Sequence, residues 1–326
     1  MQQLPALEII KPGIHSLIQD LGRFGFQHLG ITPGGPADLH AFLWANKLLN
    51  NSSNSACIEI HYGLLSLRVL LNTEIAICGA DFNVTINSIP VLNWQTHPVK
   101  VNDIIQFSGA KTGKCGYLAI KGGILTPPIL GSRSTVVRDE LNEITSTPLQ
   151  RAQILPALSP SPNDIAQSRV PRRDQPQMPR NYQSRVPRHY RPDYAAPLTL
   201  TLFPCYQWQQ LSHEQQTKLL TNTYHVSPQA NRMGYRLSGE RITNLPIKLT
   251  SEGIALGSVQ LPADGQPIVL LQERQTIGGY PKAGVISALD CGQLSQRQQG
   301  ASVNFRLGNP LVYRYKMRAL MRFFNL

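Results

Sequence analysis

The chain has 326 residues, of which 41% are hydrophobic, so it is long enough to bury a core in one large domain or in two of ordinary size. The formal net charge is +12, but half of this excess lies between Arg169 and Arg191, where seven arginines accompany one aspartate. A nucleic-acid-binding protein would spread its basic residues over a folded face with aromatic residues among them, so this distribution does not favour that class.

Membrane and metal-binding classes are not favoured either. No apolar run approaches the roughly 18 residues that a membrane-spanning helix needs. Met1–Ile10 has no basic start followed by an apolar segment, so no signal peptide is evident. The five cysteines are scattered, without CxxC or zinc-finger spacing. We therefore predict a cytoplasmic protein with reduced, mostly buried thiols, no bound metal and no membrane contact.

The first half of the chain is predicted to be rich in strands. A short apolar strand opens it at Leu7–Gly13, and Leu39–Leu49 has helical spacing of its apolar residues, with Asp38 placed to cap the helix. From Cys57 onward, apolar segments follow at intervals of roughly ten residues with Gly, Asn or Pro between them. This spacing indicates an antiparallel barrel or sandwich.

A compositional break separates the two halves. Ser159–Pro197 is rich in Pro, Arg and Gln and contains the hexapeptide QSRVPR twice. Such a composition buries too little apolar surface to offset the entropy of ordering, so we predict an exposed or disordered insert; docking to an acidic partner is the alternative. The predicted domains are residues 1–156, a linker at 157–196, and residues 197–326, with approximate boundaries and with an exchange of elements between the two domains left open.

The second half returns to a folded pattern. Leu198–Pro204 alternates like a strand, and Ser212–Tyr224 is predicted to be a helix with Ser212 as its N-cap and Gln215 completing a capping box. The final segment, Arg314–Leu326, is predicted to be a basic amphipathic helix that packs across the end of a barrel rather than on a membrane.

Several self-contained chemistries are excluded by the absence of their motifs. Gly109–Cys115 resembles a phosphate-binding loop, but it is one residue short and has Cys115 where Ser or Thr is needed. The chain has no G-x-S-x-G elbow, no G-x-G-x-x-G after a strand and no metalloprotease helix. If the protein takes part in ATP-driven chemistry, the nucleotide binds elsewhere.

Four stretches together resemble one family. They are Ile18–Asp38, Ala76–Ser88, Tyr117–Thr135, and Val226–Gly239 followed by Ser251–Pro281. In this order they are similar to the biotin-dependent carboxyltransferase-like family, which includes the C subunit of 5-oxoprolinase, KipA and proteins named allophanate hydrolase subunit 2. The resemblance covers nearly the whole chain outside the insert. It implies a mainly β fold with a few short helices, built as two cyclophilin-like β-barrel subdomains.

The resemblance also implies a function. It points to the C subunit of a 5-oxoprolinase complex that, with an A subunit and a KipI-like B subunit, opens the lactam of 5-oxo-L-proline to L-glutamate at the expense of ATP. No cofactor is expected on this chain, since ATP would be used by the complex. Two alternatives remain: a carboxyltransferase component of a urea carboxylase-like enzyme, with biotin supplied by another chain, or a non-catalytic KipA-like regulatory protein.

The chain departs from the family pattern at three places. Relatives usually carry Gly-Pro-Gln after the strand at Leu198–Pro204, where this chain has Cys205-Tyr206-Gln207. The glycines common near the end of the first barrel are replaced within Asp139–Leu155, and the basic insert is the third departure. The first two departures concern turns, so loops around a site are expected to depart from the family shape.

The candidate site is the stretch Ser251–Pro281, where polar side chains flank an apolar run and glycines lie between them. Opening a lactam calls for a cation, neutral hydrogen-bond donors and a carboxylate base. We predict an open pocket of such groups at the mouth of the second barrel, centred on Arg274. The predicted bases are Glu252, Asp264 and Glu273, and the predicted substrate-binding residues are Gln260, Gln266, Gln275, Thr276, Gly278, Gly279 and Tyr280.

Two further groups are weaker candidates. Arg232 and Tyr235, with Arg236, could surround an anion, and Asp20 with Arg23 sits on a glycine turn. For each of these residues a structural role, in a turn or a hydrogen-bond network, is the alternative. Ser132, Arg133 and Ser134 suggest a third anion site, whereas His15, His28 and His61 carry no signal beyond ordinary polar packing.

Overall fold

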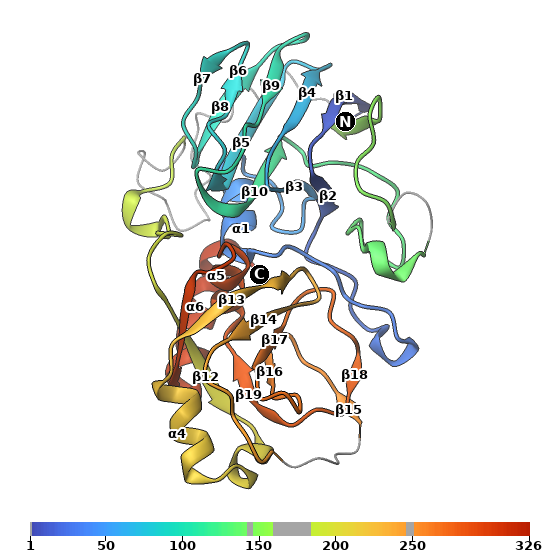
Figure 1. The fold of residues 1–326 in the computed structure, drawn as a ribbon. Helices are drawn as coiled ribbons and strands as arrows, with labels where there is room; N and C mark the ends of the chain where they lie inside the picture. Colours follow the sequence, from blue (N-terminus) through green and yellow to red (C-terminus); the bar gives the residue numbers. More distant parts are fainter. Residues whose placement is uncertain (1, 142–145, 159–183, 246–250) are drawn as a thin grey trace. The chain divides into compact units, whose positions relative to one another are not determined.

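A computed structural model describes residues 2–141, 146–158, 184–245 and 251–326 (Figure 1). The chain divides into two compact units. The first comprises Met1–Gly22 and His40–Asp193, and the second comprises Arg23–Leu39 and Tyr194–Leu326. The second unit therefore takes a segment from the N-terminal half, an exchange of elements that the predicted domain division leaves open. Most of the Pro/Arg-rich insert lies outside the described residues.

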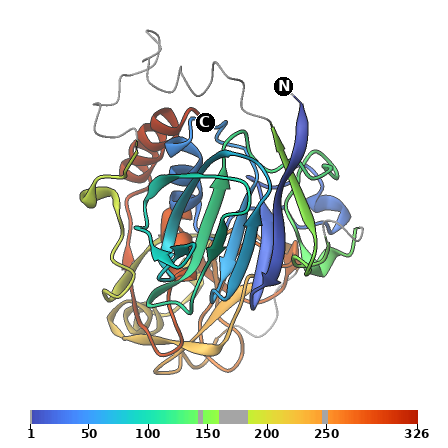
Figure 2. The ribbon, with the colours of Figure 1, turned by 90° about the horizontal axis from the view of Figure 1, so that it is seen from above.

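Two antiparallel sheets build the first unit. One has the order β11-β1-β4-β9-β6-β7 and the other the order β2-β3-β10-β5-β8. Figure 2 shows β1, in dark blue, beside β11, in light green, although the two are far apart in sequence. The strands are β1 (Gln3–Pro12), β2 (His15–Gln19), β3 (Cys57–His61), β4 (Leu65–Val69), β5 (Thr73–Asp81), β6 (Thr85–Ile86), β7 (Ile89–Pro90), β8 (Gln95–Val99), β9 (Ile104–Gln106), β10 (Thr112–Ile120) and β11 (Ile154–Leu158).

The core of the first unit lies between these two sheets. Leu67 and Ile105 come from the first sheet and Ile58, Ile77 and Leu118 from the second, and all belong to one buried apolar cluster. Because successive side chains of a strand point to opposite faces, the residues that alternate with these lie on the outer face of the second sheet. Helix α1 (Leu39–Leu48) lies against that face, since the ring of Phe42 packs edge-on against Tyr117 of β10.

The second unit is a closed barrel. Its strands follow the order β12-β19-β16-β17-β14-β13-β20, and a separate two-stranded ladder joins β15 to β18. An apolar cluster that includes Leu200, Val226, Val259 and Val269 fills the barrel. The strands are β12 (Leu198–Pro204), β13 (Tyr224–Ala230), β14 (Gly234–Ser238), β15 (Glu252–Gly253), β16 (Ser258–Gln260), β17 (Ile268–Leu270), β18 (Ile277–Gly278), β19 (Lys282–Ile286) and β20 (Ser302–Leu307).

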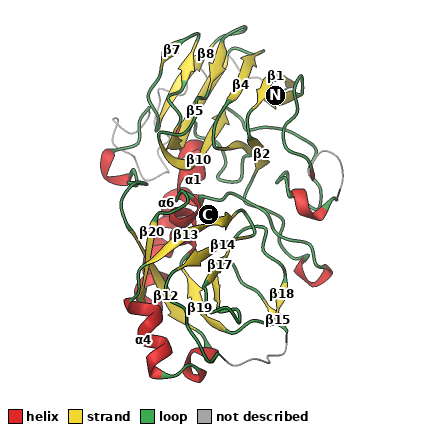
Figure 3. Cartoon of the chain, in the orientation of Figure 1, coloured by secondary structure: helices red, strands yellow, loops and turns green. Residues whose placement is uncertain are grey.

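Helices are few in the described residues, as Figure 3 shows. The second unit has α4 (His213–Thr221), α5 (Ala288–Ser295) and α6 (Pro310–Phe324). The predicted capping box is present in α4: Ser212 accepts from the Gln215 backbone and the Gln215 side chain accepts from the Ser212 backbone. Single 3-10 turns occur at Gln27–Leu29, Val137–Asp139, Arg188–Tyr190 and Tyr206–Gln210.

The C-terminal helix α6 is amphipathic, as the sequence predicts. Its inner side is fixed at both ends: the ring of Tyr313 packs 5.0 Å from that of Phe203, and Phe324 is buried. The Tyr313 hydroxyl also accepts a hydrogen bond from the backbone N–H of Ala288. The prediction of a mainly β, barrel-containing fold with a few short helices is therefore confirmed.

The segment contributed from the N-terminal half is held by polar contacts within the second unit. Arg232 donates to the carbonyl of Gly35, and Gln272 donates to that of Pro36. Asp38, predicted to cap helix α1, accepts hydrogen bonds from Tyr194 and Gln296. These contacts explain why a stretch so early in the chain belongs to the second unit.

Candidate functional site

Two neighbouring strand pairs of the second unit bring polar residues together. In the ladder of β15 and β18, Glu252 lies directly opposite Gly278. In the barrel, Gln260 at the end of β16 lies opposite Lys282 at the start of β19. The ion pair between Lys282 Nζ and Glu252 Oε1, 3.0 Å long, connects the ladder to the barrel. We call Tyr206, Gln207, Glu252, Gln260, Gln275, Gly278 and Lys282 the amide cluster.

Two amide side chains approach Gly278 closely. A Cβ atom placed on Gly278 would lie 2.8 Å from Gln275 Nε2 and 3.0 Å from Gln260 Nε2. A Cβ atom at these distances would push the Gln275 amide away and crowd that of Gln260, so glycine lets both amides converge here without a shift. The structure thus brings Gln260, Gln275 and Gly278 together, and their role in substrate binding stays a prediction.

Gln260 carries an unused hydrogen-bond donor. The residue is only 1% exposed, and its Nε2 has no acceptor among the described residues. Leaving a buried amide donor unpaired costs about 1–3 kcal/mol. Buried polar groups are nearly always paired, and an unpaired one calls for an explanation such as a ligand that supplies the missing acceptor.

Glu252 is held by three donors. Its carboxylate accepts from Tyr206 Oη at 2.8 Å, from Gln207 Nε2 at 3.0 Å and from Lys282 Nζ. Partial burial acts to raise the pKa of this carboxyl, but the bonds from Lys282, Tyr206 and Gln207 outweigh burial, so the pKa lies below its ordinary value. Glu252 is thus ionised at neutral pH, and it is a poor general base because its proton affinity is low.

Arg274 lies inside the protein, contrary to the expected open pocket centred on it. The side chain is buried, Nε donates to the Ile254 carbonyl at 3.1 Å, and Nη1 donates to the Leu271 carbonyl at 3.2 Å. Burial lowers the pKa of its guanidinium. Ile254 lies next to Gly278, since its Cδ1 would be 3.3 Å from a Cβ atom placed there, so Arg274 bonds the backbone of a neighbour of the amide cluster.

The other two predicted bases are paired with arginines. Glu273 is buried and bonds Arg232 Nε at 2.5 Å. Asp264 pairs with Arg236 at 2.9 Å on the turn between β16 and β17. Glu252, in contrast, bonds Tyr206, Gln207 and Lys282 and so belongs to the amide cluster.

The remaining predicted residues of this stretch differ in their surroundings. The Gln266 side chain bonds both backbone groups of Gly239, and Thr276 accepts from the Ile254 backbone through its carbonyl. Gly279 and Tyr280 are exposed next to Gly278. Tyr235 is buried in the barrel and donates to the Ser295 carbonyl at 2.9 Å, so it does not form an exposed anion site with Arg232.

Asp20 serves a structural role in the first unit. Its buried carboxylate accepts hydrogen bonds from four groups, the hydroxyls of Ser132 and Ser134 and the backbone N–H groups of Gly22 and Arg133. The serines that suggested an anion site therefore bind an internal anion, the Asp20 carboxylate. Arg23 is buried in the second unit, where its backbone N–H donates to Pro33.

Sequence reasoning missed three members of the amide cluster. Tyr206 and Gln207 follow β12, and Lys282 opens β19, so only the barrel topology brings them to Glu252. Tyr206 and Gln207 stand where the chain departs from the family pattern after Leu198–Pro204, and this departure is the signal in the sequence that points to them.

None of the helices in the described part of the chain has the length and apolar character needed to span a membrane.

The architecture defines a mainly β protein with a closed barrel and a cluster of amides beside one Glu–Lys pair. A family model described as "Carboxyltransferase domain, subdomain A and B" matches residues 29–307. The chain belongs to this family.

Individual relatives carry different names. A Haemophilus influenzae protein, named as the C subunit of 5-oxoprolinase, is 29% identical over 302 residues, covering 92% of this chain and 90% of that protein. A urea amidolyase of Lachancea kluyveri is 27% identical over 317 residues, but this chain spans only 17% of it. The solved Kluyveromyces lactis urea carboxylase has the same fold over 99% of this chain, with a TM-score of 0.84 and 23% identity, and this chain spans 29% of it.

Proposed function

We propose that this chain is the C subunit of an ATP-dependent 5-oxoprolinase and that its amide cluster binds the lactam. The observation that carries the proposal is the unpaired Gln260 donor beside Gln275 and Gly278. A lactam presents a carbonyl oxygen, which accepts from such a donor, and an adjacent N–H, which needs an acceptor. The near-complete length match to a protein named as the C subunit of 5-oxoprolinase supports this choice.

The charges of the cluster suit this substrate. Lys282 supplies an ammonium group for the substrate carboxylate or for an anionic intermediate, and Glu252 holds that ammonium group in place. The amide donors polarise the lactam carbonyl without adding charge. Tyr206, which is exposed, lies at the outer edge of the cluster and keeps Glu252 ionised through its hydroxyl.

We propose that this chain binds and positions the lactam, and that partner chains activate its carbonyl group. The lactam carbonyl is a weak electrophile that an ATP-driven complex activates by phosphorylation. No phosphate-binding loop occurs in the sequence, and the pKa of Glu252 is unfavourable for a base. We therefore assign ATP binding and water activation to partner chains, the A and B subunits of the complex.

A carboxyltransferase component of a urea carboxylase-like enzyme is the second candidate. The match to a urea amidolyase and the shared fold favour it. Urea and carboxybiotin carry the same carbonyl and N–H groups as a lactam, so the amide cluster would suit them as well. Biotin would then be attached to another chain.

The test begins with the chains that copurify with this one. The purified complex is assayed for L-glutamate release from 5-oxo-L-proline with and without ATP, and its chains are blotted with avidin. Glutamate release that requires ATP supports the first candidate. Biotin on a copurified chain together with carboxylation of urea would replace it with the second. Assembly with no turnover of either substrate would indicate the regulatory KipA-like alternative.

A pair of variants connects the activity to the cluster. Lys282→Met removes the ammonium group that we assign to substrate binding, and we expect KM for 5-oxo-L-proline to rise at least tenfold. Lys218→Met is the matched control, because Lys218 pairs with Glu214 and Glu240 on the solvent side of α4. Unchanged kinetics in both variants would contradict the placement of the substrate.

A further inference from the structure

A cluster of metal-binding side chains lies in the first unit, on the outer face of the second sheet. Glu59 and His61 alternate on β3, so both point to the same face. The antiparallel register with β10 places Cys115 opposite His61 and Tyr117 opposite Glu59. Cross-strand neighbours on one face are close enough for their side chains to meet.

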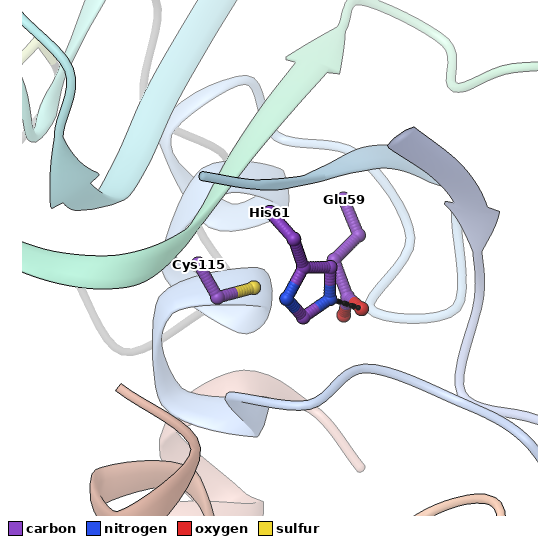
Figure 4. A group of neighbouring side chains, drawn as sticks. All are labelled: Glu59, His61 and Cys115. Atoms are coloured by element: carbon purple, nitrogen blue, oxygen red, sulfur yellow. Dashed lines mark hydrogen bonds and ion pairs between the residues drawn. The ribbon is translucent and has the colours of Figure 1, made fainter. Parts of the chain in front are cut away.

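The donor atoms of Glu59, His61 and Cys115 all lie within 4.8 Å of one another. Figure 4 shows the His61 ring between the Cys115 sulfur and the Glu59 carboxylate. His61 Nε2 is 2.7 Å from Glu59 Oε1, and the Tyr117 hydroxyl donates to Glu59 Oε2 at 2.7 Å. The centre of the His15 ring lies 5.7 Å from that of His61, a contact that limits how far the imidazole can turn.

The cluster is buried to an extent unusual for its composition. Glu59 and Cys115 are 0% exposed and His61 is 5% exposed. Carboxylates are almost never fully buried unless they are paired or bind a metal. Tyr117 and His61 hydrogen-bond the Glu59 carboxylate, so these bonds hold the three candidate ligands near one another.

The donor types select among metals. A thiolate is a soft ligand that Mg²⁺ and Ca²⁺ do not favour, whereas Zn²⁺ binds Cys, His and carboxylate together. Tetrahedral zinc holds such donor atoms about 3.3–3.7 Å apart. The contact of 2.7 Å between His61 and Glu59 therefore has to open, and the Cys115 sulfur on the other side of the ring has to move in from a separation bounded by 4.8 Å. Three protein ligands leave the fourth position to water.

We propose that Glu59, His61 and Cys115 form a zinc-binding site, with Tyr117 orienting the Glu59 ligand through its hydroxyl. Zn²⁺ with one thiolate, one carboxylate and a neutral imidazole has zero net charge, which suits a buried site. The ion takes the place of the thiol proton and of the proton shared by His61 and Glu59. Binding therefore releases at least one proton per metal.

This site has no local sequence signature because its ligands come from two strands. CxxC and zinc-finger motifs have ligands that are near in sequence, whereas Cys115 meets His61 only through the β3–β10 register. The site lies in the first unit and is independent of the proposed lactam-binding role of the second.

The test uses the full chain and zinc itself. Because the ligands are buried, the protein is refolded from denaturant with ZnCl₂, dialysed extensively, and its metal measured by mass spectrometry. We expect one zinc per chain, and refolding with Co²⁺ should give the near-ultraviolet absorption of a thiolate–cobalt bond. Absence of retained zinc in the folded wild-type chain would overturn the proposal.

Matched variants separate the site from general thiol binding. Cys115→Ser and His61→Gln should lose the retained zinc, whereas Cys291→Ser, which changes a buried thiol in the second unit, should keep it. Tyr117→Phe removes the orienting hydroxyl and should weaken zinc affinity by about 10- to 100-fold while leaving the stoichiometry at one. Should Cys115→Ser fold, by circular dichroism, and still retain one zinc, the assignment is wrong.

Discussion

Glu252 and Gly278 lie directly opposite each other in the ladder of β15 and β18, so the charged and the neutral halves of the amide cluster meet at one backbone pair. On one side, the Glu252 carboxylate accepts hydrogen bonds from Tyr206, Gln207 and Lys282. On the other, Gly278 admits the amides of two glutamines. A side chain added at Gly278 would therefore displace the two glutamine amides before it affected the Glu252–Lys282 pair.

Gly278→Ala is expected to reduce activity with little loss of stability. The new Cβ would displace Gln275 and Gln260, whose nitrogens lie 2.8 and 3.0 Å from it. Displacing donors by about 1 Å costs up to about 100-fold in rate, so we expect kcat/KM for 5-oxo-L-proline to fall about 10- to 100-fold. Gly253→Ala is the matched control on the adjacent pair, because a Cβ there meets nothing within 4 Å. Equal effects of the two substitutions would argue against the amide cluster.

Gln260→Met is expected to stabilise the protein while it impairs ligand binding. Methionine has a similar shape and removes the buried donor that has no acceptor, so the free energy of unfolding should rise by about 1 kcal/mol. Gln207 provides the comparison, since it is buried and its amide bonds Tyr206, Glu252 and the Lys282 backbone. Gln207→Met should lower the free energy of unfolding by about 1–3 kcal/mol. Denaturant titration measures both, and a loss of stability in Gln260→Met would show that this amide is paired.

Much of the architecture is predictable from sequence, because it depends on local patterns. The alternation of apolar residues gives the strands, and the Ser212–Gln215 capping box gives the start of α4. The gathering of Gln260, Gln275 and Gly278 follows from their nearness in the sequence. Glu252 joins them because β15 and β18 belong to the same stretch.

What depends on long-range topology is not predictable in this way. The orientation of Arg274 could not be read from a stretch of turns without periodicity, and the guanidinium proves to bind two backbone carbonyls. The partners of Glu252 come from the ends of β12 and β19. The sequence predicts Asp20 as a site residue because its hydrogen-bond donors cannot be inferred locally. All but one of its four donors are distant in sequence.

The Glu252 carboxyl is expected to titrate below the ordinary glutamate pKa of about 4.3. Because the pKa is lowered in the folded state, the bonds to Glu252 contribute stability above that ordinary value, and this contribution is lost as the pH falls through the folded pKa. Tyr206→Phe removes one of the three donors, so the pKa should move up towards its ordinary value. A carbon-13 NMR titration of the Glu252 carboxyl measures this shift. An unchanged pKa in Tyr206→Phe would mean that the hydroxyl does not bond the carboxylate in solution.

Asp20→Asn is expected to destabilise the first unit strongly. The carboxylate accepts from two hydroxyls and two backbone N–H groups in a buried site, and an amide would turn its own N–H₂ towards those donors. Hydrogen bonds to charged groups contribute about 1.5–3 kcal/mol each, so the loss of a fraction of them should cost about 3 kcal/mol. Asp264→Asn is the matched change on an exposed turn, where the ion pair with Arg236 should be worth no more than about 1 kcal/mol. Thermal denaturation distinguishes the two, and a mild effect of Asp20→Asn combined with lost activity would restore Asp20 as a site residue.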